Sequence, residues 1–74
     1  MNCVMIRLSS IQDVRTFVDT VTKYNMDIDL SSGRYVVDAK SIMGIFSLDL
    51  TKPIKLQSTG SDEFFEEIKP FIVD

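Results

Sequence analysis

Hydrophobic positions recur with two different periods along this chain, and the change of period separates helices from strands. From Ile11 onward the apolar residues return every three or four positions, so they share one face of a helix that we expect to run to about Tyr24. Ser10 stands three residues before Asp13, which is the spacing of a capping box, and is therefore expected to begin this helix as its N-cap. The apolar face comprises Ile11, Val14, Phe17, Val18 and Val21.

Four shorter segments have the composition or the alternation of β-strands. They are residues 4–8, 26–31, 34–38 and 54–57. Ser32 and Gly33 supply turn residues between the second and third segments, so these two are predicted to form an antiparallel hairpin. Pro53 marks the entry to the last strand, in which Ile54 and Leu56 point to one face.

Two further helices are expected after the hairpin. Lys40 and Ser41 open a short helix of about two turns, with Ser41 as its N-cap. Ser61 can cap a final helix, and Asp62 in the first turn interacts favourably with the positive end of the helix dipole. Pro70 disfavours helical geometry at the preceding residue, so the last turn should kink or stop early. The apolar stripe of this final helix comprises Phe64, Phe65, Ile68, Phe71 and Ile72.

The order of these elements predicts the fold class. The order is βαββαβα, and the three apolar helical stripes would all cover the same face of the sheet. We therefore expect an α+β fold, an open-faced two-layer sandwich in which three helices cover one face of a four-stranded antiparallel sheet. Residues 1–74 are predicted to form a single domain, because a chain of this length supports one apolar core.

The absence of histidine restricts the chemistry more than any other feature of the composition. The 74 residues contain no histidine and one cysteine. The chain therefore lacks the usual neutral-pH general base and has almost no ligands for a transition metal. Metal hydrolysis and Ser-His-Asp catalysis are excluded, and we expect neither a metal nor a cofactor.

Charge and cysteine content also limit the partners and the compartment. The net charge is −3, and the eight basic residues are scattered without a basic run, so neither nucleic acid nor a membrane surface is an expected partner. The single cysteine, Cys3, cannot close a disulfide within the chain. No cationic stretch followed by a long apolar run marks a signal peptide or a membrane span, so a cytoplasmic location is expected.

One stretch of the sequence resembles a known protein family. Residues 40–48, KSIMGIFSL, together with the order of the elements, resemble the HPr-like family, the histidine phosphocarriers of the bacterial sugar phosphotransferase system. Upstream, residues 22–25 and 27–30 are similar to the end of the first helix and the second strand of that family. The resemblance covers nearly the whole chain and implies the HPr-like fold.

The resemblance also locates the position of the active histidine of the family. In the same ungapped register, the histidine loop of the family falls on residues 8–13. The phosphoryl-accepting histidine is then replaced by Ser10, an arginine by Gln12 and a proline by Asp13. A serine ester would be too stable to pass phosphate onward, so phosphocarrier activity is predicted to be absent. Independently of the resemblance, Ser10 is expected to be a helix N-cap.

Ser41 is the candidate for phosphorylation. In Gram-positive relatives, the matching serine is a regulatory site that a dedicated kinase phosphorylates and a catabolite-control transcription factor recognises. The resemblance therefore implies HPr kinase or a transcriptional regulator as partners, and Lys40 adds a positive charge beside Ser41. A plain helix N-cap accounts for the serine equally well, so the two interpretations stay open.

The short helix also carries candidate partner-binding residues, because its apolar side chains cannot all face the core. The resemblance implies that they form a docking surface for proteins, whereas the alternative is that they cover the edge of the first helix. The candidate partner-binding residues are Ile11, Gln12, Lys40, Ile42, Met43 and Phe46.

Two functional hypotheses follow. In the first, the protein is a regulatory or protein-binding module of the bacterial carbon-regulation type, switched by phosphate on Ser41. In the second, it is a degenerate HPr-fold domain with a structural role or an unrelated protein partner and no phosphorylation. An enzyme is not expected, because the acidic residues Glu63, Glu66 and Glu67 fit the solvated face of the last helix.

Overall fold

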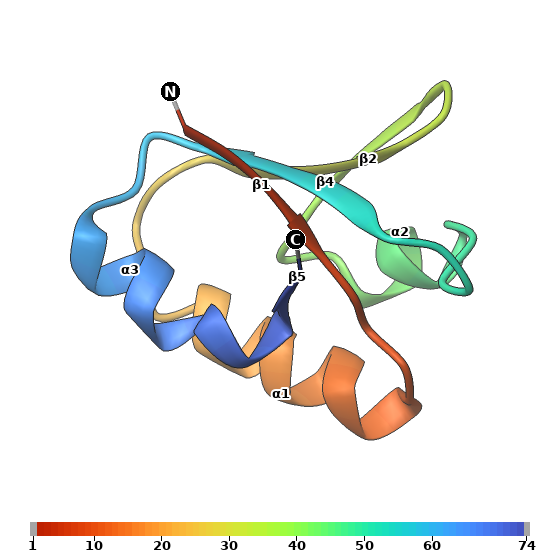
Figure 1. The fold of residues 1–74 in the computed structure, drawn as a ribbon, viewed down its shortest axis with the longest axis horizontal. Helices are drawn as coiled ribbons and strands as arrows, with labels where there is room; N and C mark the ends of the chain where they lie inside the picture. The colour runs from red at the N-terminus through yellow and green to blue at the C-terminus, as the bar shows by residue number, and fades with distance from the viewer. Residues whose placement is uncertain (1, 74) are drawn as a thin grey trace.

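The elements of the protein form a sheet with all helices on one side. The computed structural model describes residues 2–73. Its elements are β1 (Asn2–Ile6), α1 (Ile11–Val21), β2 (Ile28–Ser32), β3 (Tyr35–Asp38), α2 (Ile42–Phe46), β4 (Ile54–Ser58), α3 (Asp62–Glu67), a 3-10 helix η1 (Lys69–Phe71) and β5 (Ile72–Val73). The strands lie in the order β3-β2-β4-β1-β5, and every pairing is antiparallel. Figure 1 shows α1, α2 and α3 on the same face, which confirms the open-faced α+β sandwich.

The sheet has five strands, so the prediction of four is wrong. The final helix was expected to include Phe71 and Ile72 in its apolar stripe, but α3 ends at Glu67. Pro70 lies in the 3-10 helix η1, where its fixed φ is tolerated, and this confirms that the helix stops early at the proline. Ile72 then pairs with Ile6 at the edge of the sheet.

Two predicted boundaries also shift, because tertiary pairing determines where the elements begin and end. β1 lies two residues earlier than predicted, since all five of its residues pair with β4. Leu8 follows the strand and is nevertheless buried. Helix α1 ends at Val21 rather than near Tyr24, because Thr22 becomes its C-cap.

The core fills the space between the helices and the inner face of the sheet. Alternate strand residues point inward, as the buried pair Leu30 and Leu56 shows on neighbouring strands. Phe17 of α1 and Phe64 of α3 are fully buried above them. Within residues 2–73, none of the helices has the length and apolar character needed to span a bilayer.

The β2–β3 hairpin turns at Gly33 and Arg34, one residue later than predicted. Ser32 pairs with Tyr35, so the loop contains only these two residues. Gly33 has φ of 60°, while Arg34 has a negative φ, which is the pattern of a type II′ turn with glycine first. This turn places β3 at one edge of the sheet, where it has a single neighbour.

Candidate functional site

Ser10 is the N-cap of α1, as the sequence predicts. Its backbone is extended, with φ of −149° and ψ of 166°, and its Oγ accepts a hydrogen bond from the Asp13 backbone N–H at 3.0 Å. The Asp13 carboxylate in turn accepts from the Ser9 backbone N–H at 3.0 Å. Ser10 and Asp13 together therefore hold the start of α1.

Ser41 makes the same kind of cap at the start of α2. Its Oγ accepts from the Gly44 backbone N–H at 3.1 Å, and its side chain is exposed. The turn before it is fixed by Asp38, whose carboxylate accepts from the Lys40 backbone N–H at 2.8 Å. The Ser41 hydroxyl thus lies at the surface in a well-defined local conformation.

Lys40 contributes to the fold rather than standing free beside Ser41. Its ammonium group donates a hydrogen bond to the backbone carbonyl of Tyr24 at 2.7 Å, and the residue is half-buried. This bond ties the segment after α1 to the segment before α2. The ammonium group keeps two further N–H donors, so this bond does not by itself prevent Lys40 from pairing with a phosphate on Ser41.

The apolar candidates for partner binding are all exposed. The exposed fraction is 77% for Met43, 67% for Ile11, 42% for Phe46 and 36% for Ile42. Gln12 is exposed beside them, and its amide donates to the Thr16 hydroxyl at 3.3 Å. We call Ile11, Gln12, Ile42, Met43 and Phe46 the α1–α2 surface.

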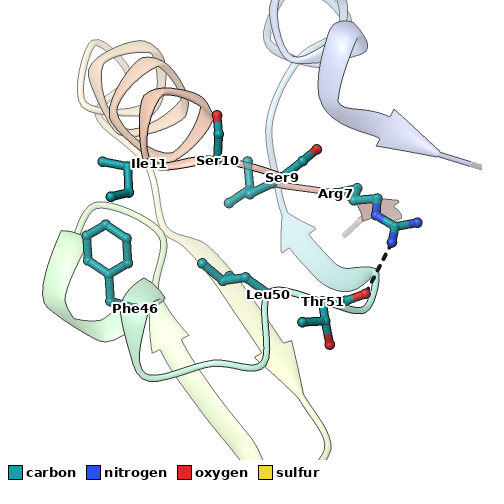
Figure 2. Close-up of a pocket in the computed structure, with 8 residues that line it drawn as sticks. Arg7, Ser9, Ser10, Ile11, Phe46, Leu50 and Thr51 are labelled. Carbon is teal, nitrogen blue, oxygen red and sulfur yellow. Dashed lines mark hydrogen bonds between the residues drawn. The ribbon is translucent and has the colours of Figure 1, made fainter.

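A shallow groove of about 480 Å³ lies at one end of the α1–α2 surface. Ile11 and Phe46 face each other across it, and Ser10 lies at the beginning of α1 beside them (Figure 2). The lining residues are Arg7, Leu8, Ser9, Ser10, Ile11, Phe46, Leu50 and Thr51. Because the lining is mostly apolar, the groove suits an apolar side chain of a partner better than a phosphoryl group.

The far end of the groove is closed by a contact that sequence reasoning missed. The Arg7 guanidinium donates to the backbone carbonyl of Thr51 at 3.2 Å (Figure 2). Arg7 follows β1 and Thr51 precedes β4, so only the pairing of these strands brings them together. No local pattern in the sequence marks this contact or the position of Leu50.

A carboxylate next to the groove is held in its charged form. The Asp49 side chain accepts hydrogen bonds from the hydroxyl and the backbone N–H of Thr51, and these bonds lower its pKa. Lys52 lies 4.0 Å from the same carboxylate. The groove thus has a mostly apolar lining that includes the cationic Arg7, and the Asp49–Lys52 pair lies next to it in the α2–β4 loop.

A second groove continues the α1–α2 surface along the two helices. It has a volume of about 430 Å³ and lies where Ile42 faces the side of α1. Its lining is more polar than that of the first groove, with Arg15 and Asp19 among the exposed residues. The exposed apolar residues thus lie between one apolar and one polar depression.

Comparison with known proteins assigns this fold and site to a family. A family model described as the PTS HPr component phosphorylation site matches residues 13–73. The chain therefore belongs to the HPr family of the sugar phosphotransferase system. The match begins at Asp13, so Ser10 and the residues before it lie outside the matched segment.

Solved structures agree with this assignment. HPr-C-His from Thermoanaerobacter tengcongensis is 29% identical with a TM-score of 0.78, and the alignment covers 95% of this chain and 89% of that one. The phosphocarrier protein HPr from Bacillus anthracis is 27% identical with a TM-score of 0.72, over 97% and 94% of the two chains. Crh, the catabolite repression containing protein of Bacillus subtilis, shares the fold at 23% identity and a TM-score of 0.65, over 93% and 88%.

Proposed function

We propose that this protein is an HPr-family module that binds a partner protein through the α1–α2 surface and does not carry phosphate between proteins. The observation that supports this best is the hydrogen bond that the Ser10 Oγ accepts from the Asp13 N–H, because the family resemblance aligns Ser10 with the phosphoryl-accepting histidine. Phosphorylation of Ser41 is the proposed regulatory event. The protein is then a non-enzymatic, cytoplasmic regulator of the bacterial carbon-regulation type.

The chemistry of Ser10 argues against phosphoryl transfer. A carrier needs a nucleophile that accepts phosphate at neutral pH and releases it again, which an imidazole does and an unactivated hydroxyl does not. The sequence contains no histidine that could act as the nucleophile or as a base for Ser10. The Asp13 carboxylate beside the cap would also repel an incoming phosphoryl group.

The exposure of the α1–α2 surface supports protein binding. Four apolar side chains of α1 and α2 are exposed, and two of them, Ile11 and Phe46, line the same groove. Grouped apolar side chains on the surface of a small protein mark an interaction site more often than scattered ones do. The groove between Ile11 and Phe46 offers a pocket for an anchoring side chain. Neither nucleic acid nor a membrane suits this surface, because it has no cluster of basic residues.

A phosphate on Ser41 would change the charge of this surface. It adds about −1.5 to −2 charges next to Ile42 and Met43. Asp38 already lies close, since it accepts from the Lys40 N–H, so the phosphate would make the region strongly acidic. A partner that binds only one of the two forms could therefore be switched by the modification, with HPr kinase and a transcriptional regulator as the proposed protein partners.

The first test addresses phosphoryl transfer. Incubation with enzyme I and phosphoenolpyruvate should give no acid-labile phosphoprotein, while an ordinary HPr with its histidine is labelled in the same mixture. Ser10→Ala should behave like the unchanged protein. Acid-labile labelling of this chain would overturn the proposal.

The second test addresses Ser41. Treatment with HPr kinase and ATP, followed by mass spectrometry, should give one phosphate that disappears in Ser41→Ala. Ser47→Ala is the matched control, because Ser47 lies at the other end of α2, where its hydroxyl donates to the Gly44 carbonyl. Phosphorylation should persist in this control.

A second candidate function is a degenerate HPr-fold domain that binds an unrelated protein without any phosphorylation. The cap between Ser41 and Gly44, together with the bond from Lys40 to Tyr24, favours it, because both residues already have structural roles. No phosphate on Ser41 under conditions that phosphorylate an ordinary HPr would favour this second function.

A further inference from the structure

The two edges of the sheet differ in how they are protected. The β5 edge contains only two residues and follows Pro70, and short strands and prolines are two ways in which proteins prevent edge pairing. The β3 edge has four consecutive residues paired with β2 without a bulge or a proline. Tyr35 and Val36 on this edge are 69% and 65% exposed.

The hydrogen-bonding groups of β3 show which part of this edge is free. Ser32 and Tyr35 close the two-residue loop as a hydrogen-bonded pair. Hydrogen-bonded pairs alternate along an antiparallel ladder, so Tyr35 and Val37 direct their backbone N–H and C=O groups toward β2. Val36 and Asp38 therefore direct their backbone N–H groups away from the sheet. The Val36 carbonyl also points outward, whereas the Asp38 carbonyl already accepts from the Ser41 N–H.

Arg34, the loop residue just before β3, and Asp38, the last residue of β3, carry charges that are complementary to the same segment in a second molecule. If two copies pair antiparallel about Val36, Arg34 of each copy lies opposite Asp38 of the other. Within one molecule, Asp38 lies directly opposite Asp29 across β2 and β3, and like charges in such a pair are destabilising. No ion pair within residues 2–73 neutralises either aspartate, so Arg34 of a second copy would place a positive charge next to two unpaired carboxylates.

We infer that the β3 edge is a self-association surface, on which a second copy of this chain pairs antiparallel about Val36. The two sheets then join into one continuous sheet with both sets of helices on the same face, as a two-fold axis perpendicular to the sheet requires. The hairpin tip projects away from the rest of the ribbon, which leaves this edge accessible (Figure 1). The pairing adds about four main-chain hydrogen bonds and buries Val36 against its counterpart.

This interface is small, so the dimer is weak. It involves one short strand from each copy and is well below the size of a standard stable interface. Dimerisation should therefore appear only at high protein concentration, on the order of 0.1–1 mM. None of the residues of the α1–α2 surface belongs to β3, and the pairing is argued without them, so this inference does not rest on the proposed function.

The test is the mass of the protein in solution as a function of concentration, measured by sedimentation velocity and by light scattering. The average mass should rise toward twice the monomer mass in the unchanged protein. Arg34→Glu and Val36→Lys should each keep the protein monomeric, because one reverses the complementary charge and the other places a charge at the centre of the pairing. Lys69→Glu, which makes the same change in net charge near the other edge, should dimerise normally.

Amide hydrogen exchange places the contact on the chain. The Val36 amide should become protected as concentration rises, and this gain should be absent in Arg34→Glu. Far-UV circular dichroism verifies that each variant is folded, which is expected because Arg34 and Val36 are exposed. A protein that stays monomeric at every concentration would overturn the inference. So would a dimer that persists in both edge variants, or one that Lys69→Glu abolishes as effectively as Arg34→Glu.

Discussion

At the scale of single residues, Ser10 and Ser41 begin two helices by the same hydrogen bond but differ in what surrounds them. The Ser10 cap is reinforced by Asp13. The Asp13 N–H donates to the Ser10 Oγ, and the Asp13 carboxylate accepts from the Ser9 N–H, so the two bonds run in opposite directions. The Ser41 side chain accepts from the Gly44 N–H, but the first turn of α2 has no acidic residue that could complete the cap as Asp13 does in α1. Because of this difference, we propose a structural role for Ser10 and a regulatory one for Ser41.

The structural role of Ser10 can be measured by its removal. Ser10→Ala should lower the free energy of unfolding by about 1 kcal/mol, because the Asp13 N–H loses its acceptor. Chemical denaturation measures this change. Ser9→Ala is the control, since within residues 2–73 only the backbone of Ser9 takes part in the cap. Equal stability of Ser10→Ala and the unchanged protein would show that the cap contributes nothing.

Gly60 gives a second prediction at this scale, because it lies against the core without room for a side chain. A Cβ atom there would meet Phe64 Cδ2 at 2.7 Å and Met26 Cε at 2.8 Å. Since Phe64 is fully buried, its ring cannot move aside, and Gly60→Ala should destabilise the protein by about 1 to 3 kcal/mol. Thermal unfolding tests this, with Gly60→Ala in a Met26→Ala background showing how much of the loss comes from the methionine.

At the scale of elements, the end of α1 is joined to α3 by a side-chain cluster. The Glu67 carboxylate accepts from the Tyr24 hydroxyl at 2.6 Å and from the Lys23 ammonium at 2.8 Å. The bond to Glu67 raises the pKa of Tyr24 to about 12, and the bonds from Lys23 and Tyr24 lower the pKa of Glu67. The two helices are thus linked through groups whose charge states depend on one another.

This linkage predicts how stability depends on pH. The pKa of Tyr24 is raised in the folded protein. Its contribution to the free energy of unfolding is therefore complete below pH 10 and is lost as the pH rises through about 12. The pKa of Glu67 is lowered, so its contribution is present above the ordinary pKa of a glutamate and is lost as the pH falls through the folded value. Glu67→Gln should weaken both dependences.

Tyrosinate absorbance measures the first effect directly. In a Tyr35→Phe background, Tyr24 is the sole tyrosine, and Glu67→Gln should move its pKa from about 12 toward its ordinary value of 10. Circular dichroism at each pH verifies that the protein is still folded. A Tyr24 pKa that does not respond to Glu67→Gln would contradict the assignment of this bond as the main cause.

The beginnings of the helices were predictable from the sequence, and so was the early stop before Pro70, whereas the end of α1 was not. Ser10, Ser41 and Ser61 each accept a hydrogen bond from a residue three positions later, and this signal is local. Just beyond the end of α1, Tyr24 bonds to Glu67, which lies 43 residues away in sequence, so no local pattern marks its position. The contact between Arg7 and Thr51 at the groove was unpredictable for the same reason, while the exposed residues of α2 were marked by the family resemblance.

At the scale of the whole molecule, β5 is the element that sequence reasoning did not anticipate. The apolar spacing of the last residues is compatible with a continued helix, and only the pairing of Ile72 with Ile6 in β1 reveals the strand. Phe71 just before it packs edge-on against Phe17, with ring centroids 5.6 Å apart. This segment therefore closes the core on the side of β1.

The contribution of β5 can be tested at Ile72, which is half-buried against the core. Ile72→Ala should lower the free energy of unfolding by about 1 to 2 kcal/mol, less than a fully buried isoleucine would. Met43→Ala, at an exposed position on α2, should stay within about 0.5 kcal/mol of the unchanged protein. Equal effects of the two substitutions in denaturant titrations would mean that β5 adds nothing to the core.

The position of β1 has a consequence for how the protein is made. Among the strands of residues 2–73, β1 is translated first, whereas its two neighbours, β4 and β5, are translated last. The apolar residues of β1, Ile6 among them, therefore have no neighbouring strand to pair with until β4 and β5 have been translated. The sheet therefore cannot be completed until β4 and β5 have emerged, and until then the apolar residues of β1 lack the strands that cover them in the folded protein.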